Sequence, residues 1–300
     1  MIEFYHVLIK NNGEIIHDIF ATSHKDLINK YFTLEEAQKR NFFRAMYSPK
    51  ENCRLDDIDN YQLIVSESYV PNWFCGDVAE TAMENLQKII ESMIIRGRKT
   101  ILLHEGAILV GNAIIDELKH SIIFAMYDNA KIKVLDNNSQ VIIMTDDCII
   151  EEMRDSTKIE EMSAFAKVLE MFDYSKILKM NGRAKVGIMN EHSRIAILKG
   201  DANIAEMHDT SQADRLKHMS SVNEMRGHSV IEEMWDWTIV EKMFDQSRIN
   251  YMNQDSKVLE MYGDSTIELM RDNAIVEKLC ENSLVQKLEQ AAQILRKKLE

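Results

Sequence analysis

Nine histidines and four cysteines are among the residues of this 300-residue chain that could bind a metal ion or transfer protons. Zinc sites need such residues at short, regular spacings, as in an HExxH motif on one face of a helix. None of the histidines falls in that spacing. The four cysteines are far apart and form no CxxC pair: Cys53, Cys75, Cys148 and Cys280. We therefore expect no metal and no cofactor. Scattered cysteines are also typical of reduced thiols, so we expect a cytoplasmic protein.

Two short segments contain residue types that occur in active sites. Ser23, His24 and Asp26 lie together, but a helix is expected to begin there, and serine and aspartate are common helix caps. Gly97-Arg98-Lys99-Thr100 resembles the end of a phosphate-binding loop, but it lacks the first glycine and the spacer of that loop. We therefore predict no catalytic residues and a protein that is not an enzyme. An enzymatic N-terminal domain is the least favoured alternative.

The composition is that of a folded, acidic protein. Hydrophobic residues make up 45% and charged residues 28% of the chain, which argues against disorder and against a membrane span. The formal net charge is −13, whereas proteins that bind the nucleic-acid backbone need a basic surface. We therefore expect no direct binding to nucleic acid and no membrane association.

A nine-residue repeat dominates the sequence from Met126 to Leu288. Every ninth residue in this range, called the anchor below, is methionine or leucine, in nineteen consecutive repeats. A small residue stands five positions before each anchor, and isoleucine or valine stands three before it, with Ala213 as the exception. Aspartate, asparagine or glycine is frequent two positions after the anchor, as expected of turns. These turns lack the paired glycines of calcium-binding nonapeptide repeats, so we expect no calcium there.

This repeat predicts a β-solenoid. In an α-helix nine residues rotate by about 900°, so successive anchors would point to opposite faces. In a strand, the small residue and the β-branched residue two positions later face the same side, and the turn residues close the unit. Nine residues are too few for a closed coil with a filled interior. We therefore expect two repeats per coil, with three repeats as the alternative.

We divide the chain into three parts: an α+β N-terminal domain (1–105), the β-solenoid (106–288) and a C-terminal helical cap (289–300). Residues 96–100 are basic and are interpreted as a hinge into the solenoid. The cap is expected because four apolar residues after the last repeat have helical spacing: Leu288, Ala292, Leu295 and Leu299. A helix there would close the open core of the solenoid.

The N-terminal domain shows alternating strand and helix patterns. A hairpin is expected around Gly13, and helices are expected to begin at Ser23, Thr33 and Asp77. The predicted strands cover residues 2–10, 14–22, 42–47 and 62–67. This order of elements indicates a small α+β domain.

Two groups of solenoid residues outside the ladder positions are candidate surfaces. The first is an acidic row directly before every second anchor, which Ile188, Lys242 and Lys278 interrupt: Glu152, Glu170, Glu206, Glu224 and Glu260. The second is an aromatic cluster within a few repeats: Trp235, Trp237, Phe244, Tyr251 and Tyr262. Exposed aromatic side chains often mark a protein-binding site. Packing against a neighbouring segment is the alternative for this cluster.

Repeats such as Gln254–Met261 and Arg226–Met234 resemble those of a group of uncharacterised proteins from gut bacteria and their phages or prophages. That group is built on tandem (Asp/Gly)-Asn-Ser-x-Val-x-x-Met units. Val70–Phe74, followed by a helix, is similar to the segment before the repeats in that group. The resemblance implies a phage or mobile-element context, and hence the host cytoplasm, but no functional residues.

These observations predict a non-enzymatic, protein-binding scaffold. Its partner would be another protein or a second copy of the chain. The alternative is an acidic mimic of nucleic acid that inhibits a host nucleic-acid-binding or defence enzyme, because the net charge of −13 suits a basic groove.

Overall fold

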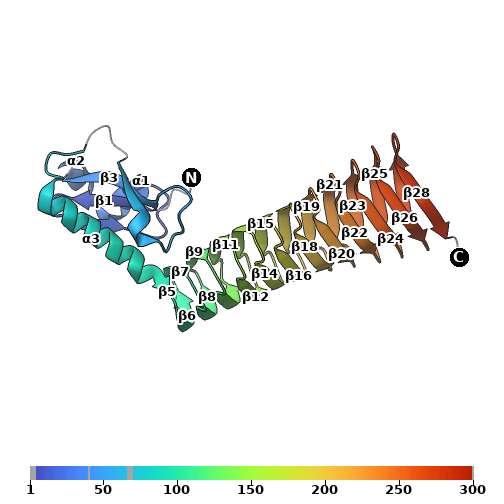
Figure 1. Ribbon diagram of the computed structural model, residues 1–300, viewed down its shortest axis with the longest axis horizontal. Helices are drawn as coiled ribbons and strands as arrows, with labels where there is room; N and C mark the ends of the chain where they lie inside the picture. The colour runs from blue at the N-terminus through green and yellow to red at the C-terminus, as the bar shows by residue number, and fades with distance from the viewer. Residues whose placement is uncertain (1–4, 40, 66–69, 299–300) are drawn as a thin grey trace. The chain divides into compact units, whose positions relative to one another are not determined.

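The computed structural model describes residues 5–39, 41–65 and 70–298. The chain divides into two compact units (Figure 1). The first contains residues 1–95 and 106–108, and the second contains residues 96–105 and 109–300. The first unit has the predicted α+β character, and the second is the predicted β-solenoid.

The first unit is built on an antiparallel sheet with the strand order β2-β1-β3-β4. The predicted hairpin joins β1 and β2, and Gly13 has a φ of +78° in its turn, a conformation that costs glycine little. Residues 2–4 and 66–67 of the predicted strands lie outside the described residues. The elements are β1 (His6–Lys10), β2 (Ile15–His17), α1 (His24–Tyr31), α2 (Leu34–Lys39), β3 (Phe42–Pro49), η1 (Ile58–Asn60), β4 (Tyr61–Val65) and α3 (Gly76–Met93).

The predicted helix starts of the first unit are largely confirmed. The Ser23 hydroxyl accepts the backbone N–H of Asp26 at the start of α1. Thr33 and Glu36 form a reciprocal capping box before α2, each side chain accepting the backbone N–H of the other residue. The prediction for α3 was wrong by two positions, because its N-cap is Cys75 and Asp77 lies in the first turn.

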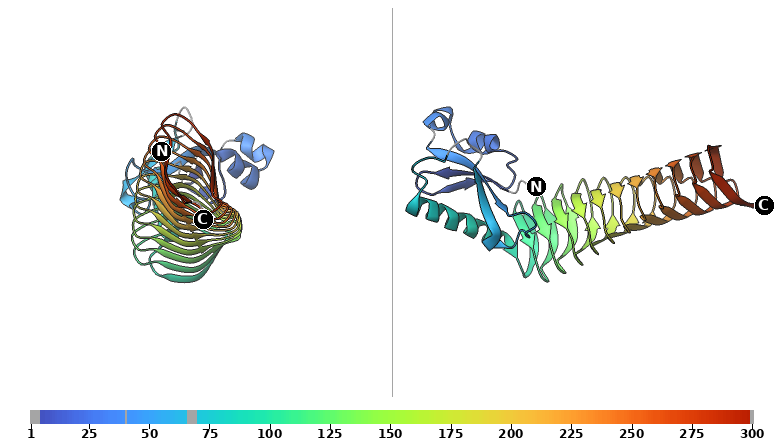
Figure 2. Two further views of the ribbon diagram at one scale, coloured as in Figure 1. Left: turned by 90° about the vertical axis from the view of Figure 1, so that its right-hand side faces the viewer. Right: turned by 45° about the horizontal axis from the view of Figure 1, so that its top comes forward.

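The solenoid is a stack of parallel strands that alternate between two sheets, each twelve-stranded in the described part of the chain (Figure 2). Its strands belong to the second unit, except for residues 94–95 and 106–108, which count with the first. The even sheet contains the even-numbered strands and the odd sheet contains the odd-numbered strands. A turn that follows an even-numbered strand is called an even turn, and one that follows an odd-numbered strand is called an odd turn. The even sheet contains β6 (Arg98–Leu103), β8 (Ile114–Lys119), β10 (Lys131–Asp136), β12 (Ile149–Met153), β14 (Lys167–Met171), β16 (Lys185–Met189), β18 (Asn203–Met207), β20 (Ser221–Met225), β22 (Ile239–Met243), β24 (Lys257–Met261), β26 (Ile275–Cys280) and β28 (Gln293–Lys298).

The strands of the odd sheet pair in the same way as those of the even sheet. Lys158 lies opposite Lys176, for example, and Met162 lies opposite Met180, a separation of eighteen residues. The odd sheet contains β5 (Ile94–Ile95), β7 (Gly106–Leu109), β9 (Ile122–Met126), β11 (Gln140–Met144), β13 (Lys158–Met162), β15 (Lys176–Met180), β17 (Arg194–Leu198), β19 (Gln212–Leu216), β21 (Val230–Met234), β23 (Arg248–Met252), β25 (Thr266–Met270) and β27 (Leu284–Leu288).

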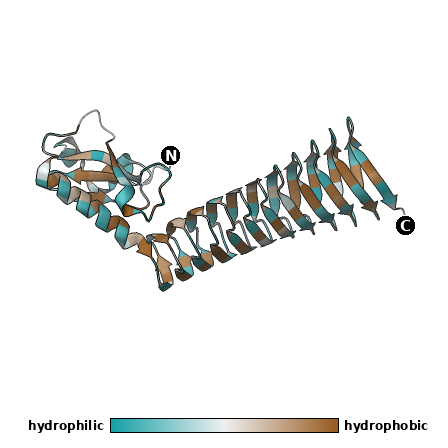
Figure 3. Ribbon diagram, in the orientation of Figure 1, coloured by the Kyte–Doolittle hydropathy of each residue, from teal (hydrophilic) through white to brown (hydrophobic). Residues whose placement is uncertain are grey.

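The anchors form the core that the repeat predicts. Every anchor from Met126 to Met270 has an exposed fraction of 0%, and Leu279 is 4% exposed. The small and β-branched positions are buried beside them, so each repeat contributes three inward side chains. Hydrophobic and hydrophilic bands therefore recur on successive strands (Figure 3). The last anchor is an exception, because Leu288 is 47% exposed.

The predicted C-terminal helical cap (289–300) is wrong. Residues 293–298 form β28, which pairs in parallel with β26, and the N–H of Gln293 donates to the carbonyl of Ala274. The repeat continues here, because Ala292 and Ile294 have the spacing of the small and β-branched residues. Pairing with an existing strand outweighs the helical spacing of Leu288, Ala292 and Leu295, since propensity is a weak determinant of structure. Leu299 lies outside the described residues.

The predicted hinge at residues 96–100 is also wrong in part. Arg98–Leu103 is β6, which pairs in parallel with β8, so the solenoid begins before residue 106. Leu102 has an exposed fraction of 0%, and Arg98 makes a bidentate ion pair with Asp116. An inward leucine and a paired arginine are properties of a strand, not of a linker.

Candidate interaction surfaces

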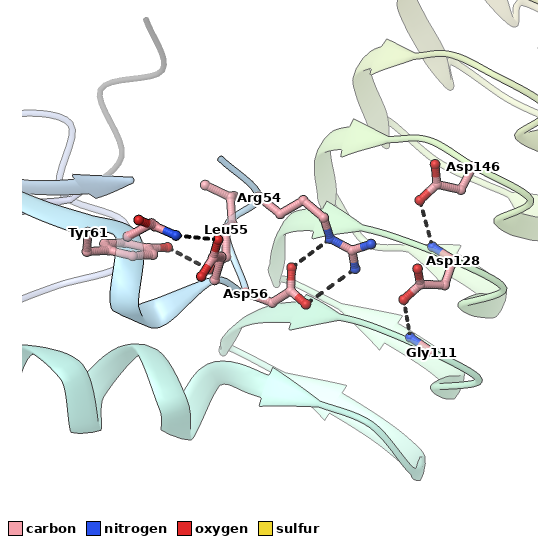
Figure 4. Close-up of polar contacts among 9 residues, drawn as sticks. Arg54, Leu55, Asp56, Tyr61, Gly111, Asp128 and Asp146 are labelled. Carbon is pink, nitrogen blue, oxygen red and sulfur yellow. Dashed lines mark hydrogen bonds and ion pairs between the residues drawn. The ribbon is translucent and has the colours of Figure 1, made fainter. Parts of the chain in front are cut away.

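The turns of the solenoid are held by side chains that reach back by one coil. The residue two positions after each anchor has a positive φ, as in Asp128 and Asp146. The carboxylate of Asp128 accepts the backbone N–H of Gly111 at 2.8 Å, and that of Asp146 accepts the N–H of Asp128 at 2.9 Å (Figure 4). Left-handed backbone is costly for residues with a side chain. The charge-assisted hydrogen bonds offset that cost and satisfy a turn N–H that has no ladder partner.

One run of these turn residues places four carboxylates in consecutive coils. Asp155, Asp173, Glu191 and Asp209 all lie in even turns, with φ values between 51° and 53°. The N–H groups of Asp155, Asp173 and Glu191 donate to the next carboxylate in the row, at 2.9, 2.8 and 3.1 Å. A hydrogen bond with the Asp136 carboxyl raises the pKa of Asp155, with burial as the second cause. In the sequence these residues stand at positions expected to form turns. That they make one row becomes visible only when turns eighteen residues apart are compared.

The predicted acidic row lies on the outer face of the even sheet. Glu152 is opposite Glu170, and Glu206 is opposite Glu224. Ile188 separates Glu170 from Glu206, and Lys242 separates Glu224 from Glu260. The five carboxylates therefore do not form a continuous row.

Most of these glutamates contact a donor on the other side of the anchor. Glu152 pairs with Arg154, Glu206 with His208, and Glu224 with Arg226. The Tyr262 hydroxyl donates to Glu260 at 2.7 Å and, with Lys278, holds the pKa of that carboxyl below its usual range. The residues before and after an anchor thus point outward together and form a pair across it. We call this arrangement the cross-anchor pair.

The five predicted aromatic residues do not form a single patch. Trp235 follows β21 in an odd turn, whereas Phe244 and Tyr262 follow β22 and β24 in even turns. Trp235 and Phe244 have the same position in their repeats, but adjacent repeats carry that position to opposite turns. Repeat position alone therefore misplaced them, because turns on one side recur every eighteen residues.

Trp235, Trp237 and Tyr251 lie on the odd side, in adjacent coils. Trp237 is 65% exposed and Tyr251 is 43% exposed. Trp235 is half-buried, and its indole N–H donates to Glu233 at 3.0 Å, which is again a cross-anchor pair. We call these three residues the odd-side aromatic group. It is the part of the predicted patch with exposed aromatic surface.

Phe244 and Tyr262 stack on each other in the even turns. Their ring centroids are 5.3 Å apart, and the Arg226 guanidinium lies 4.4 Å from the Phe244 centroid. The Lys278 ammonium lies 5.4 Å from the centroid of Tyr262. These half-buried rings contact each other and the cations that flank them, so they are largely occupied within the solenoid.

The interior of the solenoid has two different corners, which the sequence predictions missed. Every eighteenth residue from Ser121 to Ser283 is serine or threonine, ten in all, and none is more than 5% exposed. The opposite corner, from Ala130 to Ala292, is mostly alanine. Reading the small residues at every second repeat would have shown this alternation. Several hydroxyls of the serine corner have no hydrogen-bond partner in the described residues: those of Ser175, Ser193, Ser211, Ser229, Ser247 and Ser265.

Two pairs of titratable groups of the first unit lie close together. The Tyr5 hydroxyl and His17 Nδ1 are 2.8 Å apart, and the rings of His6 and His24 are 4.6 Å apart. Burial raises the pKa of Tyr5 and lowers the pKa of His17. Both shifts favour the neutral forms at neutral pH, so this pair is a poor proton donor and acceptor there.

Over the described ranges, no three histidine, cysteine or carboxylate side chains are placed to share a metal ion. In the same residues no helix has the length and apolar character needed to cross a membrane. Comparison of the chain with protein families, with curated proteins and with solved structures finds no match.

Proposed function

We propose that this protein is a non-enzymatic scaffold of a phage or mobile element, in which a rigid solenoid presents a surface for binding another protein. The phage context rests on the resemblance of the repeats described above. The rigidity follows from parallel strands whose core and turns repeat from coil to coil. The odd-side aromatic group carries the binding proposal.

Trp237 is the observation with most weight. A tryptophan that is 65% exposed at the tip of a turn contributes little to the core, and the anchors fill the interior without it. Indole and phenol rings supply large contact areas at a low cost in conformational entropy, so they are frequent in binding hot spots. Trp235, Trp237 and Tyr251 together suit a protein partner or a second copy of the chain.

We also propose that the unit of this surface is a coil of two nonapeptides. Paired strands are eighteen residues apart in both sheets, as in Lys158 with Lys176 and Lys167 with Lys185. The serine corner and the back-reaching carboxylates recur with the same period. A partner would therefore contact side chains at intervals of eighteen residues, with about 4.8 Å between successive contacts.

The test is affinity purification of the tagged chain from its native cells, with and without phage infection. The double variant Trp237→Ser with Tyr251→Ser should keep the melting temperature of the solenoid and lose the captured partner or the self-association. Tyr174→Ser is the matched control, because Tyr174 is a turn aromatic that is 57% exposed on the even side. Retention of binding by the double variant would place the interface elsewhere. Absence of any partner for the unaltered chain would refute the scaffold function.

The acidic mimic of nucleic acid is the second candidate, and the carboxylate row of Asp155, Asp173, Glu191 and Asp209 favours it. Coils about 4.8 Å apart place these carboxylates at a regular spacing along one side. Two observations weigh against it. Three carboxylates of this row already accept a backbone N–H. The separate row of glutamates before the anchors of the even sheet is interrupted by Ile188 and Lys242.

The mimic is tested by competition with duplex DNA for a basic host enzyme. The variant Asp173→Asn with Glu191→Gln removes two charges and keeps two acceptors, as Gln254 does when it accepts the N–H of Asp236 at 2.8 Å. A mimic should lose competition in this variant without loss of stability. Equal competition by the variant and the unaltered chain would exclude the mimic.

A further inference from the structure

At one anchor on the odd side, both positions of the cross-anchor pair are basic. At several other anchors a glutamate before the anchor contacts a donor after it, as in Glu206–His208, Glu224–Arg226 and Glu233–Trp235. At Leu216 the same two positions hold Arg215 and Lys217. Two cations then point outward from one strand end, which is unfavourable for an isolated rod.

Neighbouring coils enlarge this basic site. Lys179 and Arg215 lie on either side of Ile197 in the register of the odd sheet. Lys199 and Lys217 are neighbours after their anchors, because the N–H of Lys199 donates to Met180 and that of Lys217 donates to Leu198, at 3.0 and 2.9 Å. We call the group of Lys179, Lys199, Arg215 and Lys217 around Ile197 the basic patch.

The basic patch is exposed and is not neutralised by bonded carboxylates. Lys179 and Arg215 are exposed, and Lys199 and Lys217 are half-buried. Two nearby acids are engaged with other cations, Asp214 with Arg194 at 2.7 Å and Asp201 with Arg183 at 3.7 Å. Two further acids, Glu161 and Glu233, lie opposite Lys179 and Arg215 in the register. Within the described residues, none of the four cations of the patch forms a salt bridge.

On the even sheet, the residues before the anchors at this level of the solenoid are glutamates. Glu206 and Glu224 lie on the even sheet in the same coils as Lys199, Arg215 and Lys217 on the odd side. The net charge of the chain is −13, yet four cations gather on this side. They give it a local positive potential that attracts anionic groups. The patch also adjoins the odd-side aromatic group, because Lys217 is followed in its row by Trp235.

We propose that the basic patch binds a short acidic segment of a protein partner, with an apolar residue of that segment over Ile197. This inference rests on the proposed scaffold function and names the chemistry of the partner. The patch spans three coils, about 10 Å, which suits a few carboxylates. A glutamate follows the patch at each end along the sheet, because Glu161 lies opposite Lys179 and Glu233 lies opposite Arg215. These carboxylates would repel a polyanion that continued along the sheet, so a nucleic acid is disfavoured.

A second copy of the chain is a less suitable occupant. In a second copy, Glu206 and Glu224 already bind His208 at 2.8 Å and Arg226 at 2.6 Å. Three carboxylates of the row in the even turns already accept backbone N–H groups. A partner segment that is free in solution brings carboxylates without such competition.

The test measures fluorescence anisotropy of a labelled nonapeptide with four glutamates around a central leucine, at low and at physiological salt. We expect saturable binding to the full chain, and the variant Arg215→Glu with Lys217→Glu should weaken it about tenfold or more. Lys167→Glu with Lys185→Glu is the matched control, because it changes the net charge equally on the exposed even sheet. The control should bind within about twofold of the unaltered chain.

Other outcomes would overturn the proposal. These are equal loss in both charge variants, equal binding of a peptide with glutamines in place of the glutamates, or tighter binding of a labelled ten-nucleotide thymidine strand. A change in sedimentation without peptide binding would point to a second copy instead. If the charge-reversal variant does not fold, Arg215→Gln with Lys217→Gln gives the same comparison. Loss of the captured partner only in the Trp237 and Tyr251 variant would refute the patch and leave the scaffold function standing.

Discussion

The two units of the chain bury their side chains in different ways, and the difference determines how each responds to change. In the solenoid the same three inward positions recur, and the anchors from Met126 to Met270 are all 0% exposed. In the first unit the core is assembled once from distant residues, such as Leu8, Leu27 and Phe42. The solenoid therefore depends on register along its whole length. The first unit depends on particular contacts and on its titratable side chains.

Deleting Lys176 should have the largest effect and should be confined to the solenoid. A shift by one residue turns the inward side chains of a strand outward, so β15 and every later strand would lose their register. Hydrogen–deuterium exchange should show faster exchange over residues 177–298 and little change in the first unit. Deletion of Glu51, in an exposed turn of the first unit, is the control and should remain local. Exchange that rises only in the coil of Lys176 would show that one coil can absorb the insertion or loss of a residue.

Met171→Asp should cost several kcal/mol of stability, because it buries an unpaired carboxylate in the core. Lys167→Ala on the same strand removes an exposed side chain and should change the free energy of unfolding by less than about 0.5 kcal/mol. Urea unfolding followed by circular dichroism compares the two variants. Equal midpoints would contradict the buried register of the anchors.

Acid should weaken the first unit before the solenoid. Burial lowers the pKa of His17 in the folded unit, so below the ordinary histidine pKa of about 6.5 the unfolded state binds the proton more readily. Stability should therefore fall as the pH decreases from about 6.5 towards the lowered pKa of His17, and it should be insensitive to this group above that range. Exchange of residues 5–39 at pH 7.5 and 5.5 measures the effect.

The variant His17→Gln provides the control for acid sensitivity. It removes the titrating ring and keeps a polar side chain near the Tyr5 hydroxyl, so it should reduce the pH dependence of the first unit. The same pH dependence in the variant would assign the effect to another group.

Replacing unpaired hydroxyls in the serine corner should give the smallest effect, and it should be stabilising. Ser193→Ala and Ser211→Ala each remove a buried hydroxyl without a partner, at a gain of about 1 kcal/mol or less. Ser121→Ala is the matched control in the same corner, since the Ser121 hydroxyl donates to the carbonyl of Lys119 at 2.8 Å, and its loss should destabilise. Thermal melts of the three variants test the sign. Destabilisation by all three would show that the corner hydroxyls contribute in the folded state.

The sequence was sufficient for the features that depend on local periodicity. The anchors, the small and β-branched positions and the helix caps at Ser23 and Thr33 are confirmed because each is a property of neighbouring residues. The C-terminal helix failed because Leu288, Ala292 and Leu295 satisfy both a helical spacing and the strand repeat, and pairing with β26 decides between them.

The candidate surfaces were harder to predict, because they depend on which repeats share a side of the coil. Trp235 and Phe244 occupy equivalent positions in adjacent repeats and lie in opposite turns. The serine corner and the basic patch are visible only when residues are compared at intervals of eighteen. Contacts such as Glu233 with Trp235 also depend on side-chain geometry, which periodicity does not specify. Whether the aromatic group or the acidic row binds a partner stays a prediction.

The carboxylates that reach back by one coil give the solenoid a direction of assembly. The turn N–H of Asp173 is satisfied only when Glu191 is in place, and that of Glu191 only when Asp209 is in place. Each coil is therefore completed by the coil made after it, which matches the order in which a ribosome releases the chain. Growth by templated addition at the newest coil avoids long-range search, since each new strand meets a preformed partner. A nascent chain stalled partway would carry a single layer of unsatisfied turns, always at its most recent coil.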